Sequence, residues 1–327
     1  MRKKAGINGF GRFGIHLLKY WLDRSEESSF QIHFINDDSI NINEAINLIL
    51  DDDSVVFNKY KIKVLDNYIR FQKPNNVVFN ILFTNDIKDE ISWIGKPDIF
   101  FECSGKNTLK NDNIKFLKDK TEVVIISATS WDADSTVVYG FNHQKQKFNK
   151  KIISYGSCTV NAYVPLAYHL NKKYGIIDSD VNVIHNIQKY RLDNNNTLNR
   201  KFCTLQKSGI NLLNFLNINN FIVNYTVVPY TGVSIIDYRF RLKKRVAKIE
   251  FLEFLNHECL EGKFKGLYHV EEYDLGPEVH NCTTSSSVFI SEGINILNDQ
   301  LYLFGYFDNE NSVNRFYDLA CYISLNI

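Results

Sequence analysis

The sequence lacks any large excess of charge and any long apolar run. Its 327 residues carry a formal net charge of +1, which gives no indication of a nucleic-acid or acidic-membrane partner. No apolar run approaches the roughly 18 residues that a transmembrane helix needs. The basic N-terminal residues lead directly into a strand-like run, without the apolar segment of a signal peptide. We therefore expect a cytoplasmic protein with no membrane and no nucleic-acid partner.

The sequence also lacks paired cysteines and internal repeats. Its cysteines form no C-x-x-C pair and match no zinc-ligand spacing, so we expect no metal site. Without a secretory signal, we interpret them as reduced thiols of a cytoplasmic protein. They are Cys103, Cys158, Cys203, Cys259, Cys282 and Cys321.

Short apolar runs alternate with amphipathic stretches in the first half of the chain. "AGING" at 5–9, "IHFIND" at 32–37 and "EVVIISA" at 122–128 are examples. Continuous apolar strands between helices are typical of a parallel sheet covered on both faces. Later runs such as "VSIIDYRFRL" at 233–242 are longer and partly alternating. The pattern predicts an α/β fold: a doubly wound parallel-sheet domain, then an α+β domain with a mixed or antiparallel sheet.

A G-x-G-x-x-G motif formed by Gly9, Gly11 and Gly14 lies between the first strand-like run and a helical stretch. The first glycine permits a tight turn, the second lets the backbone approach a pyrophosphate, and the third lets helix and strand pack closely. Asp37 follows about 20 residues later, where an acid binds a ribose hydroxyl. Together they favour dinucleotide binding over a plain tight turn. The acid favours NAD over NADP, because it repels a 2′-phosphate.

Cys158 follows the turn-prone triplet at 155–157 and opens an apolar helical stretch. It is either a small core residue or a nucleophile at a helix N-terminus. His185, within "VNVIHNI", is either a core histidine or a base. If the two side chains meet, the imidazole and the helix N-terminus both lower the pKa of the thiol, and the imidazole can move protons. These residues alone do not show that they meet.

Taken together, these motifs resemble the glyceraldehyde-3-phosphate dehydrogenase family nearly from end to end. The similar segments, in order, are "INGFGRFG", "INDD", "FECSG", "ISATS", "SYGSCTVN" and "YFDNENSVNRFYDLACYI". The separation of Cys158 from His185 is also that of the family's pair. The resemblance implies an NAD-binding domain over 1–157, completed by a C-terminal helix at 308–327, and a catalytic domain over 158–307.

The resemblance implies an NAD-dependent, phosphorylating aldehyde dehydrogenase. In that family's chemistry, Cys158 attacks an aldehyde to give a thiohemiacetal, and His185 takes the hydroxyl proton as hydride passes to NAD. Inorganic phosphate then releases the thioester as an acyl phosphate, and the backbone N–H of Cys158 helps to hold the oxyanion. The implied cofactor-binding residues are Gly9, Phe10, Gly11, Arg12, Phe13, Gly14, Asp37, Ser104, Gly105, Ser127 and Asn309. The implied substrate-binding residues are Ser157, Thr159, Gln188, Ser208 and Gly209.

The sequence departs from the family where the substrate phosphate is held. Gln188 and Val227 stand in place of a threonine and an arginine, and valine cannot replace the bidentate fork of arginine. Ser208-Gly209 stands for a Thr-Gly pair, and Asn85 for an arginine beside the adenine. We therefore expect an altered substrate-phosphate site. Candidate replacement cations are Lys189, Arg191, Arg200, Lys201 and Lys207.

Several alternatives stay open. One open question is the aldehyde, which is glyceraldehyde 3-phosphate, erythrose 4-phosphate or an unphosphorylated compound. Another is the group that releases the thioester, which is water instead of phosphate in a non-phosphorylating enzyme. A non-catalytic binding protein on the same fold is the rival from another class. We expect a homo-oligomer, most simply a dimer, because the loop between His185 and Ser208, which meets a neighbouring subunit in the family, is short here.

Overall fold

The computed structural model describes residues 2–52, 60–187, 192 and 197–327, and of Asn309 it describes the backbone alone. The chain divides into two compact units. Unit 1 comprises Met1–Val137, Asn142–Gly156 and Phe316–Ile327, and unit 2 comprises Val138–Phe141 and Ser157–Arg315. None of the helices in the described part of the chain is long and apolar enough to cross a membrane.

Unit 1 is built on a parallel-rich sheet, sheet A, with strand order β3-β4-β5-β2-β1-β6-β7-β9-β8. In this order, all neighbouring strands from β5 across the sheet to β8 pair in parallel. At the other edge, β3 pairs antiparallel with β4, and β4 pairs antiparallel with β5. Its strands are β1 (Lys3–Asn8), β2 (Phe30–Asn36), β3 (Lys61–Leu65), β4 (Tyr68–Gln72), β5 (Val78–Thr84), β6 (Ile99–Glu102), β7 (Val123–Ile126), β8 (Ser135–Thr136) and β9 (Lys151–Ser154).

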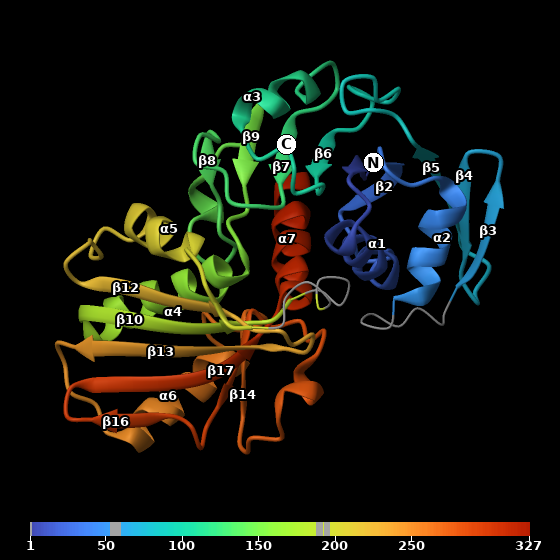
Figure 1. The fold of residues 1–327 in the computed structure, drawn as a ribbon. Coiled ribbons are helices and arrows are strands. Elements are labelled where there is room, and N and C mark those ends of the chain that lie inside the picture. The colour runs from blue at the N-terminus through green and yellow to red at the C-terminus, as the bar shows by residue number, and fades with distance from the viewer. Residues whose placement is uncertain (1, 53–59, 188–191, 193–196) are drawn as a thin grey trace. The chain divides into compact units, whose positions relative to one another are not determined.

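Helices connect the central strands of sheet A, as Figure 1 shows for α1 and α2. The helix α2 begins with a capping box, in which Asn41 and Glu44 satisfy each other's backbone N–H groups. Apolar side chains fill the space against the strands, and the rings of Phe100 and Phe116 stack with centroids 4.0 Å apart. The helices of unit 1 are α1 (Arg12–Asp23), α2 (Ile42–Asp51), α3 (Lys110–Asn113) and the end of α7 (Asn309–Ser324).

Unit 2 is built on a mixed sheet, sheet B, with strand order β11-β12-β10-β13-β17-β15-β14 and β16 paired to β17. The pairs β10–β12 and β14–β15 are parallel, and the other pairs are antiparallel. Its strands are β10 (Ile176–His185), β11 (Asn199–Arg200), β12 (Phe221–Val227), β13 (Ser234–Leu242), β14 (Tyr268–Glu271), β15 (Ser287–Ile290), β16 (Asn295–Leu297) and β17 (Gln300–Phe307).

Helices cover one face of sheet B (Figure 1). Alternate residues of β10, such as Val181 and Val183, are buried against these helices, while Asp180 and Asn182 lie on the other face. We call that second face the outer face of sheet B. The helices of unit 2 are α4 (Cys158–Tyr174), α5 (Thr204–Leu212), α6 (Lys248–Leu260) and the first part of α7.

The predicted fold class is confirmed. Sheet A is parallel-rich with helical connections, and sheet B is mixed, as the two textures of the sequence predicted. The antiparallel edge formed by β3 and β4 was not anticipated. The assignment of a cofactor-binding role to one part of the chain and a catalytic role to the other stays a prediction.

Candidate active site

Cys158 is the first residue of α4. Ser157 precedes it as the N-cap, and its Oγ accepts a hydrogen bond from the backbone N–H of Val160 at 3.4 Å. This cap fixes the start of the helix, so the thiol sits where the N-terminal N–H groups and the helix dipole favour negative charge. The Cys158 side chain is partly exposed, so a small molecule can reach it.

His185 is the last residue of β10, and its ring faces the thiol. The distance from His185 Nε2 to Cys158 Sγ is 3.6 Å. The other ring nitrogen, Nδ1, lies 2.8 Å from the carbonyl oxygen of Asn186. A carbonyl only accepts, so the proton of the neutral ring is assigned to Nδ1, and Nε2 is left to accept a proton from the thiol. The structure thus brings together the two residues whose encounter the sequence left open.

Aromatic rings hold His185 from two sides. The ring centroid of Tyr225 lies 5.6 Å away and that of Phe307 5.5 Å away. His185 itself is 7% exposed. The packing and the Nδ1 contact together fix the orientation of the imidazole toward Cys158.

Three hydroxyl groups, which we call the hydroxyl cluster, join the starts of α4 and α5. The cluster consists of Ser157, Thr159 and Thr204. Ser157 Oγ lies 3.2 Å from Thr159 Oγ1, and Thr204 Oγ1 donates to Ser157 Oγ at 3.0 Å. Thr159 Oγ1 also lies 3.6 Å from the sulfur of Cys203. Thr204 was not predicted as a site residue, although a Thr before an amphipathic stretch is a recognised signal of a helix start.

Ser208 and Gly209 lie further along α5. Ser208 is buried, and a Cβ added to Gly209 would come within 2.8 Å of the Phe221 ring, so close packing explains the glycine. Within the described part of the chain, the hydrogen bonds of the hydroxyl cluster run through Thr204 rather than Ser208. A substrate-binding role for these two residues stays a prediction. Gln188, the other expected substrate ligand, lies outside the described residues.

The glycine-rich loop of unit 1 follows β1 and leads into α1. Gly9 has φ +92°, and a Cβ there would meet the backbone N of Ser104 at 2.3 Å. A Cβ at Gly14 would meet the carbonyl oxygen of Gly9 at 2.3 Å, whereas nothing lies within 4 Å of a Cβ at Gly11. Only the middle glycine therefore borders open space, and it is also the N-cap of α1, with no side-chain cap. A loop of this shape has room for a pyrophosphate at the helix N-terminus.

Asp37 follows the end of β2 and is hydrogen-bonded to this loop. Its Oδ2 accepts from the backbone N–H of Phe10 at 2.6 Å, and its Oδ1 accepts from the backbone N–H and the hydroxyl of Ser39 at 2.9 and 2.6 Å. Asn85, which stands where an arginine was expected, donates to the carbonyl oxygens of Asp37 and Ile40. Asn85 thus shapes the turn that carries the acid.

Glu102, which was not predicted from the sequence, connects the second loop of unit 1 to the first. The Glu102 carboxylate is 1% exposed and accepts from Asn8 Nδ2 at 2.7 Å and from the backbone N–H of Ser104 at 2.8 Å. Burial raises its pKa. The backbone N–H of Ser127 donates to the Glu102 carbonyl at 2.9 Å. Ser104, its neighbour Gly105 and Ser127 are thereby held in loops that follow β6 and β7.

The aromatic residues of the glycine-rich segment serve packing. Phe10 is fully buried with its ring edge-on to Phe83, and Phe13 lies edge-on to Tyr155 and Phe316. Arg12 opens α1 and is partly exposed. Among the described residues there is no group of three or more His, Cys, Asp or Glu side chains that could hold a metal ion.

A dinucleotide-type loop on a parallel sheet and a thiol–imidazole pair on a separate unit are features of thiol-dependent dehydrogenases. The chain is 26% identical over 350 residues to glyceraldehyde-3-phosphate dehydrogenase 1 of Bacillus cereus, covering 98% of each protein. It is 29% identical to the cytosolic glyceraldehyde-3-phosphate dehydrogenase of Pisum sativum, again over 98% of each. It is 28% identical to that of Taxus baccata, over 94% of this chain and 93% of the relative.

No protein-family model matches the chain. The resemblance inferred from the motifs is nevertheless confirmed: over nearly its whole length, the chain is similar to glyceraldehyde-3-phosphate dehydrogenases at 26–29% identity. The low identity agrees with the departures from the family pattern noted above.

We expect iodoacetamide to modify Cys158 at neutral pH at least about tenfold faster than Cys282 or Cys321, because the imidazole and the helix start favour its thiolate. Burial raises the pKa of the other thiols, Cys103, Cys203 and Cys259. Peptide mass spectrometry over a time course measures the rates. His185→Gln should slow labelling of Cys158 and leave Cys282 unchanged. Equal rates at Cys158 and Cys321 would contradict the assignment of Cys158 as an activated thiol.

Proposed function

We propose that this protein is an NAD-dependent aldehyde dehydrogenase that acts through a covalent adduct on Cys158. The observation that carries the proposal is the 3.6 Å contact between Cys158 Sγ and His185 Nε2 at the start of α4. The similarity to glyceraldehyde-3-phosphate dehydrogenases over nearly the full chain supports the reaction class. A non-catalytic binding protein is the weaker alternative, because such a protein gains nothing from an aligned thiol–imidazole pair.

The cofactor proposal rests on the shape of the loop in unit 1. The open space beside Gly11, the uncapped start of α1 and the carboxylate of Asp37 suit the pyrophosphate and ribose of NAD. Gly9 and Gly14 permit the loop, and Ser104, Gly105 and Ser127 belong to the neighbouring loops. The roles expected of Arg12 and of the Asn309 side chain remain part of the proposal. When bound, the nicotinamide supplies the acceptor for a hydride.

The proposed chemistry begins with the thiol. His185 Nε2 takes the proton from Cys158 Sγ, and the thiolate attacks the aldehyde carbon to form a C–S bond. His185 returns the proton to the oxygen of the resulting thiohemiacetal, and the backbone N–H of Cys158 stabilises the charge on that oxygen during attack. As the carbon is oxidised to a thioester, Nε2 takes the hydroxyl proton again. The 2.8 Å contact of Nδ1 with the Asn186 carbonyl keeps the correct tautomer at each step.

The second half-reaction releases the acyl group from Cys158. The starts of α4 and α5 and the hydroxyl cluster of Ser157, Thr159 and Thr204 offer donors to an anion, which favours inorganic phosphate as the attacking group. Gln188, Ser208 and Gly209 are the further candidates that the family pattern suggests. Water as the attacking group gives a carboxylic acid instead of an acyl phosphate, so identification of the product decides between the two versions.

The nucleophile is tested by Cys158→Ser. We expect this variant to lose aldehyde-dependent NADH formation by at least about a thousandfold, because a serine hydroxyl remains protonated beside a neutral imidazole. NAD binding, measured by calorimetry, should stay within about twofold of the wild type. Cys282→Ser is the matched control and should retain activity. Appreciable turnover by Cys158→Ser would contradict the covalent mechanism.

The cofactor preference is tested by steady-state kinetics with both dinucleotides. We expect kcat/KM to be at least about tenfold higher with NAD than with NADP, since a 2′-phosphate beside Asp37 adds like-charge repulsion. Asp37→Asn should reduce the preference, while retaining one oxygen for the loop contacts. The neighbouring acid serves as the control: Asp38 pairs with Lys106 at 3.2 Å on the surface. If Asp38→Asn relaxes the preference and Asp37→Asn does not, the ribose assignment is wrong.

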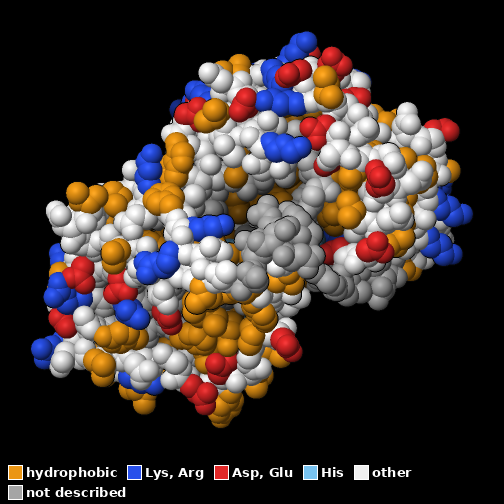
Figure 2. Space-filling view, viewed as in Figure 1, with side chains coloured by type: hydrophobic (Ala, Val, Ile, Leu, Met, Phe, Trp, Pro, Cys, Tyr) orange, Lys and Arg blue, Asp and Glu red, His pale blue; other side chains and the backbone are white. Residues whose placement is uncertain are grey.

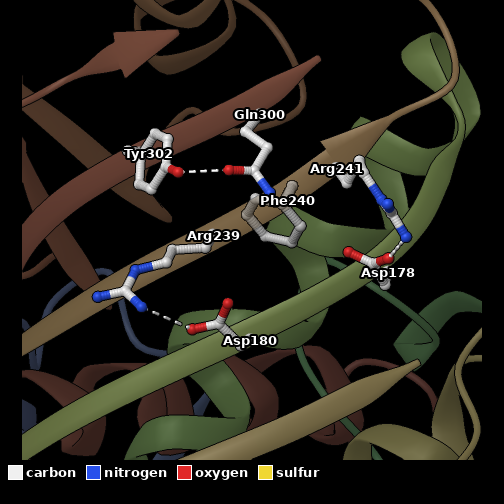
Figure 3. A pocket seen from close by; sticks show the side chains of 7 residues that line it. All are labelled: Asp178, Asp180, Arg239, Phe240, Arg241, Gln300 and Tyr302. Atoms are coloured by element: carbon white, nitrogen blue, oxygen red, sulfur yellow. Dashed lines mark hydrogen bonds and ion pairs between the residues drawn. The ribbon is translucent and has the colours of Figure 1, made fainter. Parts of the chain in front are cut away.

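The outer face of sheet B is the surface that we propose for self-association. One end carries a polar pocket of about 240 Å³ (Figure 3). Two ion pairs line it: Arg239 with Asp180 at 3.2 Å, and Arg241 with Asp178. A surface that bears both signs of charge can meet a second copy of itself across a twofold axis.

Another part of the outer face is apolar. Ile235 and Phe304 pack beside the buried ring of Tyr306, and Figure 2 shows hydrophobic side chains gathered over the strands labelled β13 and β17 in Figure 1. Contiguous apolar patches on a protein surface commonly mark interfaces. This face therefore supports a homo-oligomer formed through sheet B.

Light scattering of the purified protein tests the assembly. We expect a homo-oligomer, most simply a dimer, and we expect Phe304→Asp to shift it to monomer by placing a charge in the apolar patch. Ile249→Asp is the matched control, since Ile249 is 72% exposed on α6, and it should not change the mass. A wild-type protein that is monomeric at micromolar concentration would contradict the proposal.

A further inference from the structure

Tyr225 lies beside the catalytic pair and has no role in the chemistry proposed so far. The strands β10 and β12 pair in parallel, with Val183 opposite Tyr225 and His185 opposite Val227. Side chains of directly paired residues share a face, so Tyr225 and Val227 lie on the same face of sheet B as His185. The Tyr225 ring packs against both His185 and the core cluster that Cys158 touches.

The Tyr225 ring lies beside that of His185, with the ring centroids 5.6 Å apart, and its hydroxyl is available to bond a ligand. Burial raises the pKa of Tyr225, and the nearby thiols of Cys158 and Cys203 raise it further. The phenol therefore stays protonated at neutral pH and can donate a hydrogen bond. Its hydroxyl has no hydrogen-bond partner among the residues that the structure describes. The side chain is partly exposed, so it is not sealed in the core.

The residues of β12 that share this face with His185 carry no charge. The strand partner of Tyr225, however, is a lysine: the backbone N–H of Lys201 donates to the Tyr225 carbonyl at 3.1 Å, and the Lys201 side chain is exposed. Val227, which the family pattern would replace with arginine, is apolar and 8% exposed. Arg200, a candidate replacement cation, donates to Asn224 Oδ1 at 2.9 Å. Asn224 alternates with Tyr225 along β12, so the guanidinium is bound on the opposite face of the sheet. On β12, a substrate phosphate beside His185 would therefore face valine and a neutral phenol, with Lys201 as a candidate cation at the edge of the sheet.

We propose that Tyr225 is a specificity-determining residue, whose hydroxyl binds a neutral hydroxyl group on the carbon next to the aldehyde. The carbonyl oxygen is assigned to the backbone N–H of Cys158, which leaves the phenol for the adjoining carbon. A phenol both donates to and accepts from an alcohol, whereas a phosphate needs charged donors. The preferred substrate class is a short, uncharged hydroxyaldehyde. This inference rests on the proposed function and names the substrate of the same site.

The first experiment compares glycolaldehyde with acetaldehyde, which differ by one hydroxyl group. In the wild type, kcat/KM for NADH formation should be higher with glycolaldehyde. Tyr225→Phe should lower it about 3- to 10-fold for glycolaldehyde, the effect of losing one neutral hydrogen bond, and leave acetaldehyde unchanged. Tyr230→Phe is the matched control, because Tyr230 lies past the end of β12 and is 40% exposed. Equal losses on both aldehydes would overturn the proposal, since Tyr225 would then act through His185.

A second comparison uses D-glyceraldehyde and D-glyceraldehyde 3-phosphate. The proposal predicts that the phosphate does not improve kcat/KM in the wild type, and that Val227→Arg shifts the preference toward the phosphorylated compound. A wild-type preference for the phosphorylated aldehyde that disappears in Lys189→Ala, Arg191→Ala or Lys201→Ala would overturn the inference of an uncharged substrate. It would leave the proposed aldehyde dehydrogenase activity intact.

A measurement that does not depend on hydride transfer separates the role of Tyr225 from the proposed dehydrogenase activity. An aldehyde that adds to Cys158 protects the thiol from iodoacetamide. Glycolaldehyde should protect the wild type at lower concentration than acetaldehyde does, and this difference should vanish in Tyr225→Phe, whose unprotected alkylation rate should equal the wild type's. Selective protection without NADH formation would refute the proposed function and support the role of Tyr225 in binding the hydroxyl group. NADH formation with identical protection curves in wild type and variant would refute the role of Tyr225 alone.

Discussion

The contact between Cys158 Sγ and His185 Nε2 is the interaction on which the account of this protein depends. It joins a helix start to a strand end at 3.6 Å, and each partner is separately oriented, the thiol by the Ser157 cap and the imidazole by the Asn186 carbonyl. A thiol alone at a helix start is only a weak indication of chemistry. An imidazole whose Nε2 faces that thiol is the arrangement that the proposed nucleophile and its base require.

The glycine-rich loop of unit 1 depends on a different constraint, the space around its three glycines. Gly9 and Gly14 lie so close to other backbone atoms that no side chain fits, whereas Gly11 borders empty space. The same loop is bound to Asp37 through the Phe10 N–H. The carboxylate to which we assign the ribose therefore also shapes the loop, so the proposal couples the geometry of the glycine-rich turn to the choice of cofactor.

Local patterns in the sequence predicted those features of the fold and the site that residues close together in the sequence determine. The alternation of apolar runs and amphipathic stretches predicted the parallel-rich sheet A, and the longer alternating strands predicted the mixed sheet B. The glycine motif and the separation of Cys158 from His185 pointed to the candidate site. What the pattern could not show was the meeting of that pair, which depends on how α4 packs against β10.

The residues that were missed depend on strand register and long-range packing. Tyr225 matters because β12 pairs in parallel beside β10, and no local signal fixes that register. Thr204 joins the hydroxyl cluster only because the starts of α4 and α5 meet. Glu102 is an acid in an apolar run, and its partners come from the end of β1 and the loop after β6. Val227 was noticed as a departure, but its place beside His185 comes from the sheet.

The most direct test of the central claim is to trap the acyl group. The protein is mixed with NAD and glycolaldehyde in phosphate-free buffer, quenched in acid within one turnover, and analysed by peptide mass spectrometry. The account predicts a glycolyl mass increase on the peptide that contains Cys158, in proportion to the NADH formed, and none in His185→Gln at the same time. NADH formation with no adduct on Cys158, or with an adduct on another cysteine, would contradict it.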